Sequence, residues 1–334
     1  MGTHKVCSVT EPLQPKEIAV IGAGVIGSAW AARWLLKGCD VRLYDPADAA
    51  EQTVSEVLEN ARYGWERLGI APKSEGNLEH VETISEAVQQ ADLVQESGPE
   101  DLALKKTILS QIEEFADSSV LIASSTSGLL PSKLQDEMIH PERLVVAHPF
   151  NPVYLIPMVE VVGGRQTSPK SISRAMYYYT YCGMKPLQVR VEIDAFIADR
   201  LLEAVWREAL WLIEDEIATT EEIDDVIRFG FGLRWAQMGL FENYRIAGGQ
   251  GGMEHFIRQF GPSLDWPWSK LTETPPMTEE LVKRITQQSD AQSGHYSIRE
   301  LERIRDTNLV DMLLALEKNA WGAGLTISEL RNKI

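Results

Sequence analysis

The chain has 334 residues, and its 44% hydrophobic and 24% charged content is ordinary for a folded globular protein. This length favours two domains built around a large core. The formal net charge of −17 disfavours nucleic acid as a partner, because phosphates need a basic surface. Three scattered cysteines argue against a disulfide framework and against a metal site.

The first segment of the chain is polar and contains no apolar stretch typical of a signal peptide. No apolar run elsewhere approaches the roughly 20 residues that a membrane helix needs. We therefore expect a flexible tail over residues 1–16, a cytoplasmic protein and no membrane partner.

The first half of the sequence alternates short apolar strands with helical segments. The expected strands are 17–21, 40–44, 91–95, 120–123 and 144–147, and the clearest helices are 28–36, 47–67 and 102–115. This alternation predicts an α/β fold with a Rossmann-type, doubly wound parallel sheet over residues 17–191. From residue 192 to 334 the pattern is mainly α-helical and begins with a long amphipathic helix over 193–217, which indicates a second domain.

A glycine-rich turn joins the first predicted strand to the first predicted helix. Gly22, Gly24 and Gly27 have the spacing of a dinucleotide-binding turn, in which they allow a tight bend, a close phosphate approach and close helix packing. Val25 and Ile26 lie at the start of the helix, where backbone amides stabilise phosphate charge. The alternative is a glycine-rich turn that binds nothing.

Asp45 ends the second predicted strand, 18 residues after Gly27. An acidic residue there accepts hydrogen bonds from the adenosine ribose hydroxyls and repels a 2′-phosphate. No basic residue follows it, since the next three residues are Pro46, Ala47 and Asp48. The sequence therefore predicts NAD as the cofactor in preference to NADP.

His148 opens the segment His-Pro-Phe-Asn-Pro, and Glu160 follows it by twelve residues. The two prolines predict a turn between a strand over 144–147 and another over 158–162, which brings the two side chains together. A histidine oriented by a carboxylate is typical of general acid–base catalysis. Beside NAD, His148 would take the hydroxyl proton of an alcohol while hydride leaves carbon, and Glu160 would stabilise the imidazolium. The alternative is a histidine bound to a backbone group, with Glu160 as an edge-strand charge.

These motifs resemble the 3-hydroxyacyl-CoA dehydrogenase family over residues 17–260. The segments that carry the resemblance are 22–27 with Asp45, 96–100 with Lys105, 124–127, and 148–152 with Glu160. The resemblance implies that Ser127 hydrogen-bonds the substrate oxygen, that His148 is the general base and that Glu160 orients it. It also implies that Glu100 and Lys105 line the cofactor site and that the protein is a homodimer through its helical domain. Taken alone, Ser127 could instead cap a helix over 129–134.

Two features depart from the family's pattern. Asp199 stands where the family has a catalytic asparagine, and a carboxylate cannot donate a hydrogen bond unless it is protonated. Asp199 then has a different task or pairs with a nearby arginine. The stretch over 63–82 is short and has no evident basic cradle for the phosphates of CoA. This second departure favours a small 3-hydroxy acid as the substrate.

The second domain has many aromatic residues near its glycines. Phe231, Trp235, Tyr244 and Phe256 are candidates for a ring box that binds a quaternary ammonium group, with about 0.5–2 kcal/mol per ring. Packing in the core or at a dimer interface is the alternative. This segment continues to Trp266-Pro267-Trp268. Together with Trp206-Arg207-Glu208 and Gly261-Pro262-Ser263-Leu264, it resembles the carnitine-oxidising subgroup of the family.

L-carnitine, a small 3-hydroxy acid with a trimethylammonium group, is therefore the expected substrate. Arg234 or Arg245 would hold its carboxylate, and Asp199 would offset its cationic charge. Other members for small acids, of the L-gulonate 3-dehydrogenase or lambda-crystallin type, remain open, as does a 3-hydroxyacyl-CoA enzyme. A structural or sensor protein that binds NAD without catalysis is the non-enzymatic alternative.

Overall fold

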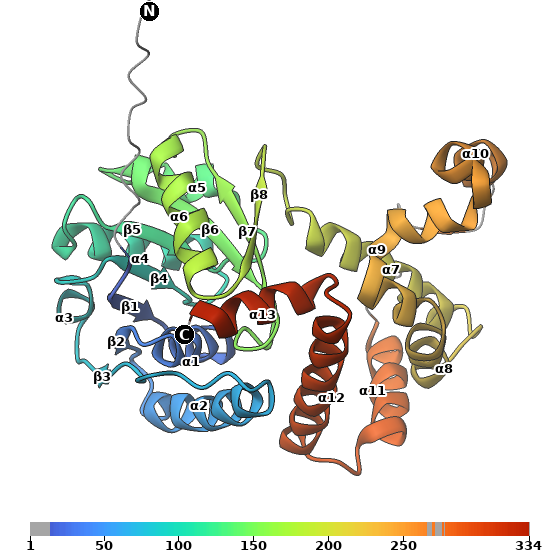
Figure 1. Ribbon diagram of the computed structural model, residues 1–334, viewed down its shortest axis with the longest axis horizontal. Coiled ribbons are helices and arrows are strands. Elements are labelled where there is room, and N and C mark those ends of the chain that lie inside the picture. The colour runs from blue at the N-terminus through green and yellow to red at the C-terminus, as the bar shows by residue number, and fades with distance from the viewer. Residues whose placement is uncertain (1–13, 266–268, 271–275, 277, 334) are drawn as a thin grey trace, which may run out of the picture. The chain divides into compact units, whose positions relative to one another are not determined.

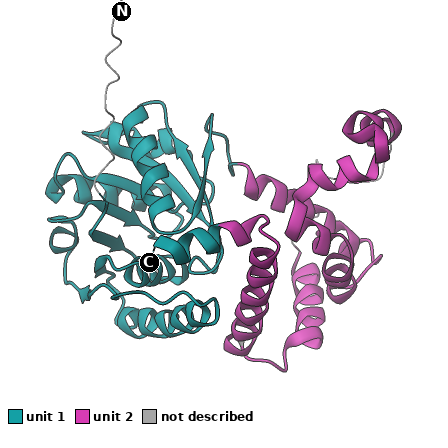
Figure 2. Cartoon of the chain, in the orientation of Figure 1, with its two compact units in different colours: residues 1–196, 326–334 teal, residues 197–325 magenta. Residues whose placement is uncertain are grey.

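The computed structural model describes residues 14–333 except 266–268, 271–275 and 277, so most of the predicted tail and Trp266-Pro267-Trp268 lie outside the described residues. The chain divides into two compact units (Figure 2). The first runs to Phe196 and also contains the C-terminal segment from Thr326, and the second spans Ile197–Leu325.

The first unit contains one eight-stranded sheet with the order β3-β2-β1-β4-β5-β6-β7-β8. The strands are β1 Glu17–Ile21, β2 Asp40–Tyr44, β3 Leu78–His80, β4 Leu93–Glu96, β5 Leu121–Ser124, β6 Leu144–Pro149, β7 Met158–Gly163 and β8 Lys185–Val189. The first six are parallel, β7 is antiparallel to β6, and β8 is parallel to β7. The order 3-2-1-4-5-6 is that of a Rossmann sheet, so the predicted fold class is confirmed.

Helices lie on both faces of this sheet (Figure 1). They are α1 Val25–Leu36, α2 Ala50–Arg67, α3 Ile84–Val88, α4 Leu102–Phe115, α5 Pro131–Gln135, the 3₁₀ turn η1 Pro141–Arg143 and α6 Pro169–Tyr181. On one face, Ile21, Val94 and Ile122 pack with Leu109 and Ile112 of α4 in a single buried cluster. Each such side chain contributes roughly 1.5–3 kcal/mol when it is fully buried. This core holds the carboxyl ends of the central strands in place.

The second unit is helical. Its elements are α7 Ala198–Glu214, α8 Thr220–Asp225, the π-helical segment η2 Val226–Phe231, α9 Gly232–Ala247, η3 Gly249–Gly251, α10 Gly252–Phe260, η4 Gly261–Asp265, α11 Glu279–Ser293, α12 Ile298–Lys318 and the start of α13 Ala323–Lys333. The predicted helix over 193–217 is shorter in the structure, because positive φ angles at Phe196 and Glu216 break it at both ends. No helix among the described residues is long and apolar enough to span a membrane.

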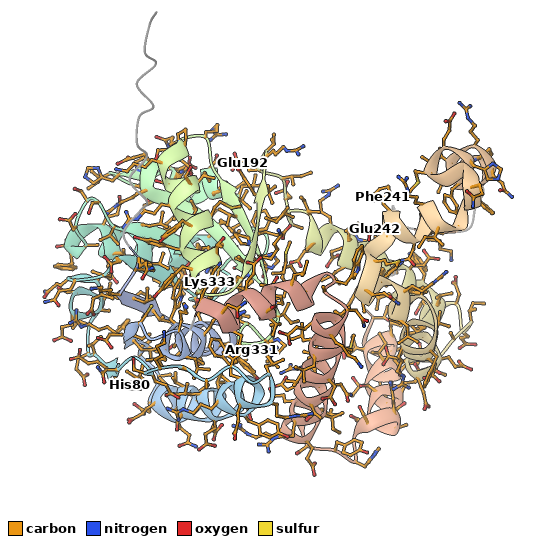
Figure 3. All side chains as sticks on the ribbon, in the orientation of Figure 1. His80, Glu192, Phe241, Glu242, Arg331 and Lys333 are labelled. Atoms are coloured by element: carbon orange, nitrogen blue, oxygen red, sulfur yellow. The ribbon has the colours of Figure 1, made fainter. Side chains whose placement is uncertain are left out.

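The end of α13 packs within the first unit, although the sequence pattern places residues 326–334 in the helical part. Leu330 is buried, and its side chain occupies the space in which a Cβ at Gly183 would stand. Lys37 Nζ donates to Lys333 O at 3.1 Å. Figure 3 labels Arg331 and Lys333 on this helix. The contacts join the chain's last helix to the α1 and α6 region of the sheet domain.

Candidate active site

The glycine turn between β1 and α1 has the geometry that a bound dinucleotide requires. Gly22 has φ +102°, and a Cβ there would lie 2.6 Å from Ser97 O. A Cβ at Gly27 would lie 1.8 Å from Gly22 O, so the turn closes tightly on the helix. At Gly24, by contrast, a Cβ would meet no atom within 4 Å, and no side chain caps the helix. The space above Gly24 and the α1 amides is therefore open to a phosphate.

A cavity of about 600 Å³ opens beside this turn. Of the predicted cofactor residues, Gly22, Gly24, Val25, Ile26 and Asp45 line it, while Gly27 lies behind the turn. The remaining wall of the cavity was not predicted from the sequence. It is largely apolar and includes Ile84, Pro99, Leu104 and Ile108. Such a wall suits a planar base, and the described lining contains no lysine or arginine. The cavity fits a dinucleotide without a 2′-phosphate.

Asp45 anchors the turn through both carboxylate oxygens. Its Oδ2 accepts from Ala23 N at 2.6 Å, and its Oδ1 accepts from Ala47 N at 2.8 Å. The carboxylate is half-buried at the end of β2. It therefore stabilises the glycine turn and also presents negative charge to the cavity.

His148 and Glu160 are directly paired residues of the antiparallel β6–β7 ladder. His148 Nδ1 lies 3.0 Å from Glu160 Oε2, and the residues are 4% and 0% exposed. The predicted contact between the two side chains is thus confirmed. Glu160 is not an edge-strand charge, because β8 pairs with the other side of β7. In this low-dielectric surrounding the hydrogen bond holds the imidazole firmly.

The imidazole also has aromatic neighbours. The rings of Phe150 and Phe196 lie 4.9 and 5.8 Å from the His148 ring, measured between centroids. Since β6 is parallel to β5, His148 lies near the carboxyl edge of the sheet, as does the glycine turn. This edge is where ligands bind in open α/β sheets.

Glu100 organises the turn that carries Ser127. Its Oε1 accepts from Thr126 Oγ1 at 2.5 Å and from the backbone amides of Ser127 and Gly128 at 3.2 Å. Ser127 is exposed and does not cap a helix, since α5 begins at Pro131 after Leu130 without a side-chain cap. The N-cap alternative for Ser127 is therefore wrong.

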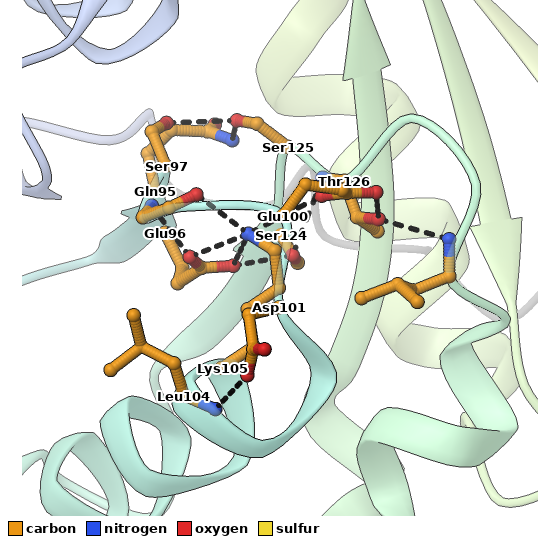
Figure 4. Close-up of polar contacts among 12 residues, drawn as sticks. Gln95, Glu96, Ser97, Glu100, Asp101, Leu104, Lys105, Ser124, Ser125 and Thr126 are labelled. Atoms are coloured by element: carbon orange, nitrogen blue, oxygen red, sulfur yellow. Dashed lines mark hydrogen bonds and ion pairs between the residues drawn. The ribbon is translucent and has the colours of Figure 1, made fainter. Parts of the chain in front are cut away.

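Lys105 is almost fully buried at 1% exposure, and neither it nor Glu100 lines the 600 Å³ cavity. Lys105 Nζ donates to both oxygens of Glu96, at 2.9 and 3.1 Å, and to Gly98 O at 3.0 Å (Figure 4). Ser124 Oγ also donates to Glu96. Glu96, which was not among the predicted site residues, is thus the centre of a buried network below the site.

The predicted substrate residues lie on helices of the second unit. Asp199 is in the first turn of α7, where the helix dipole favours a negative charge. Phe231 and Trp235 form one ring pair with centroids 4.4 Å apart, and Tyr244 and Phe256 form a stacked pair at 4.5 Å. Arg234 is exposed on α9, as is Arg245. The rings therefore form two directly packed pairs.

The Rossmann sheet, the open glycine turn and Asp45 define a dinucleotide-binding protein, and the buried histidine–carboxylate pair lies near the same edge of its sheet. Residues 17–193 match the 3-hydroxyacyl-CoA dehydrogenase NAD binding domain, and residues 196–297 match the C-terminal domain of the same family. The chain belongs to the 3-hydroxyacyl-CoA dehydrogenase family, and its cofactor is NAD.

Similar proteins include L-carnitine dehydrogenases. The chain is 56% identical over 318 residues to the L-carnitine dehydrogenase/betainyl-CoA thioesterase of Agrobacterium fabrum, covering 95% of this chain and 65% of that protein. It therefore spans about two thirds of the length of that two-activity relative. It is 51% identical over 315 residues to the L-carnitine dehydrogenase of a Pseudomonas species, covering 94% of this chain and 98% of that protein.

A solved structure with a similar fold is the 5-formyl-3-hydroxy-2-methylpyridine 4-carboxylic acid 5-dehydrogenase, described as an NAD+ dependent dismutase. Its TM-score is 0.77 at 28% sequence identity, with coverage of 90% of this chain and 98% of that chain. Because 90% of this chain is covered, the similarity includes residues of both units.

Proposed function

We propose that this protein oxidises L-carnitine to 3-dehydrocarnitine with NAD, and that His148 is the general base. The observation that carries the proposal is the buried hydrogen bond between His148 Nδ1 and Glu160 Oε2 near the carboxyl edge of the NAD-binding sheet. The substrate follows from relatives named L-carnitine dehydrogenase that are 50–56% identical over most of the chain.

The roles of the two residues follow from the chemistry of imidazole. Bound NAD supplies the two-electron acceptor for the alcohol carbon. Because Nδ1 faces a carboxylate, the neutral ring carries its proton on Nδ1 and presents Nε2 as the base. Once Nε2 takes the hydroxyl proton, Glu160 stabilises the imidazolium. Ser127, held by Glu100, is the proposed hydrogen-bond donor to the substrate oxygen.

Electrostatics around α2 support a small substrate. Arg62 donates to both oxygens of Glu75, at 3.0 and 3.1 Å from Nε, so this cation is already paired. The segment from the end of α2 to β3 contains no additional helix that could carry a basic arm. A nucleotide with several phosphates, such as CoA, has no basic cradle there.

We assign the second unit, from residue 197, to substrate binding and dimerisation. Asp199 is proposed to offset the trimethylammonium charge, Arg234 to hold the carboxylate, and one of the two ring pairs to face the methyl groups. Replacing Trp235 with leucine should raise the KM for L-carnitine more than the KM for an uncharged 3-hydroxy acid. Equal increases for the two substrates would exclude the ring from cation recognition.

A homodimer through α7 is supported by the apolar side chains that this helix exposes. Leu201, Leu202 and Trp206 are 59%, 59% and 61% exposed. Neighbouring apolar groups of this kind on one helix are typical of an interface. Light scattering on the purified protein should give twice the chain mass, and a Leu202→Glu variant should give the mass of one chain. An unchanged mass for the variant would place the interface elsewhere.

The test of the function is NADH formation with L-carnitine, D-carnitine, L-gulonate and 3-hydroxybutyryl-CoA in parallel. We expect turnover with L-carnitine above all others. His148→Ala should lower turnover by about 10²- to 10⁴-fold, the range of general acid–base catalysis, while NAD affinity stays nearly unchanged. His140→Ala is the matched control, because that histidine is exposed in the same unit. Loss of NAD binding in His148→Ala would make the residue structural, and NAD binding without turnover of any 3-hydroxy acid would indicate a sensor.

A further inference from the structure

A chain of four hydrogen-bonding side chains runs from the core of the first unit to the cofactor cavity. Tyr179 Oη lies 2.7 Å from Gln95 Oε1, Gln95 Nε2 lies 2.9 Å from Ser125 Oγ, and Ser125 Oγ lies 2.9 Å from Ser97 Oγ. Figure 4 shows the last three members. Tyr179 and Gln95 are 0% exposed, whereas Ser97 is half-buried and lines the cavity. The chain therefore connects a buried phenol to the wall of the NAD site.

The direction of the hydrogen bonds is fixed at Gln95. Its Nε2 faces the backbone oxygen of Ala123 at 3.4 Å, and a carbonyl oxygen can only accept a hydrogen bond. The amide nitrogen therefore points toward Ala123 and Ser125, and the amide oxygen points toward Tyr179. Burial raises the pKa of Tyr179 well above its ordinary value, so the phenol keeps its proton and donates it.

The same reasoning continues to the serines. Ser125 Oγ accepts from Gln95, and its own proton has one acceptor in the described chain, which is Ser97 Oγ. Either hydroxyl of this pair could donate to the other, but the proton left over would belong to Ser125, outside the cavity lining, if Ser97 donated, and belongs to Ser97, inside the lining, if Ser125 donates. In the second arrangement Ser97 Oγ accepts from Ser125, and its proton is available to a group inside the cavity.

We propose that Ser97 contacts the cofactor, donating its hydroxyl proton to an oxygen in the ADP-ribose half of NAD, and that Ser125, Gln95 and Tyr179 are positioning residues. The ADP-ribose half follows from the neighbours of Ser97. Its backbone nitrogen donates to Ile21 O at 2.7 Å, and its carbonyl oxygen packs beside Gly22 in the phosphate-binding turn. The inference concerns cofactor binding alone and does not depend on which alcohol the enzyme oxidises.

Calorimetric titration of the full chain with NAD and with ADP-ribose, without substrate, tests this role. Ser97→Ala should weaken both ligands about 2- to 12-fold, the range that one hydrogen bond spans. The melting temperature is measured for each variant to separate binding from stability. Unchanged dissociation constants, or weaker NAD binding with unchanged ADP-ribose binding, would overturn the proposal.

The positioning role predicts that the effects are not additive. Tyr179→Phe should weaken NAD binding in the parent protein but add nothing in the Ser97→Ala background, because its effect passes through Ser97. Tyr177→Phe on the same helix is the matched control and should leave NAD binding unchanged. If Tyr179→Phe does not fold, Ser125→Ala replaces it in the same cycle. An effect of either variant that persists without the Ser97 hydroxyl would contradict the chain.

Discussion

The ion pair of Glu96 and Lys105 lies inside the first unit, with residue exposures of 0% and 1%. Glu96 Oε1 accepts from Lys105 Nζ at 2.9 Å and from Gly98 N at 2.7 Å, and its Oε2 accepts from Ser124 Oγ at 2.5 Å. Every contact of the carboxylate joins β4 to a neighbouring segment. We predict that Lys105→Met strongly destabilises the protein, because it leaves this carboxylate buried without a cation.

The expected loss is about 3–5 kcal/mol, the cost of removing one partner from a buried pair. At about 2–4 °C per kcal/mol for a domain of 150–250 residues, the melting temperature should fall by roughly 6–20 °C. Scanning calorimetry of the full chain measures it. Lys106→Met is the matched control, since Lys106 lies on the same helix but pairs with Glu137, whose side chain is 72% exposed, and a solvent-accessible pair contributes about 0–1 kcal/mol.

The double variant Lys105→Met with Glu96→Gln distinguishes the ion pair from general packing. Removing both charges should recover a large part of the loss, because no uncompensated charge then remains in the interior. Two results would contradict this reasoning: a melting temperature of Lys105→Met within about 2 °C of that of Lys106→Met, or a loss of stability in the double variant equal to the sum of the two single losses. Either would mean that burial of the Glu96 carboxylate does not require the Lys105 ammonium group.

Three other predictions concern the same unit. Gly24→Ala should leave the melting temperature unchanged, because a Cβ there meets no atom within 4 Å. It should weaken NAD binding at least about tenfold, because the added methyl group occupies the space through which the phosphate approaches the backbone. An unchanged NAD affinity in a titration would contradict this. Asp45→Ala should weaken NAD binding and reduce the preference for NAD over NADP in parallel titrations. An unchanged preference would mean that the carboxylate does not contact the ribose. Burial raises the pKa of Cys39 and of Cys182 to about 12, so in a Cys7→Ser variant no thiol should react with a disulfide reagent near neutral pH until the protein unfolds. Rapid labelling of the folded variant would show that these thiols are accessible.

The elements with strong local signals could be predicted from the sequence, and the edge strands could not. β1, β2 and α4 have the predicted bounds, because continuous apolar runs and helical spacing mark them. β3 and β8 escaped prediction, since β3 has three residues and β8 is a largely exposed strand with Lys185 and Pro186. Such strands form because they pair with the neighbouring strand of the sheet, and their own residues do not indicate this pairing.

The candidate site divides in the same way. The glycine turn and the His148–Glu160 contact were predictable, because a short motif and a single hairpin connection determine them. The Glu96–Lys105 network and the chain from Tyr179 to Gln95 were not, since they depend on burial and on partners up to 84 residues apart. A sequence shows that such polar residues exist, but only the folded sheet shows which of them meet.

The ladder between β6 and β7 has a consequence for how this protein tolerates change. Five matched positions, from Val145 opposite Gly163 to Pro149 opposite Val159, fix the alignment through main-chain bonds. Since alternate strand residues project to opposite sides, inserting or deleting one residue inside either strand would rotate the imidazole and the carboxylate apart. Substitutions at the other rungs preserve the alignment as long as they suit a strand. Variants of this protein can therefore exchange most residues of both strands and still keep the contact between His148 and Glu160, whereas a change of strand length by one residue would abolish that contact.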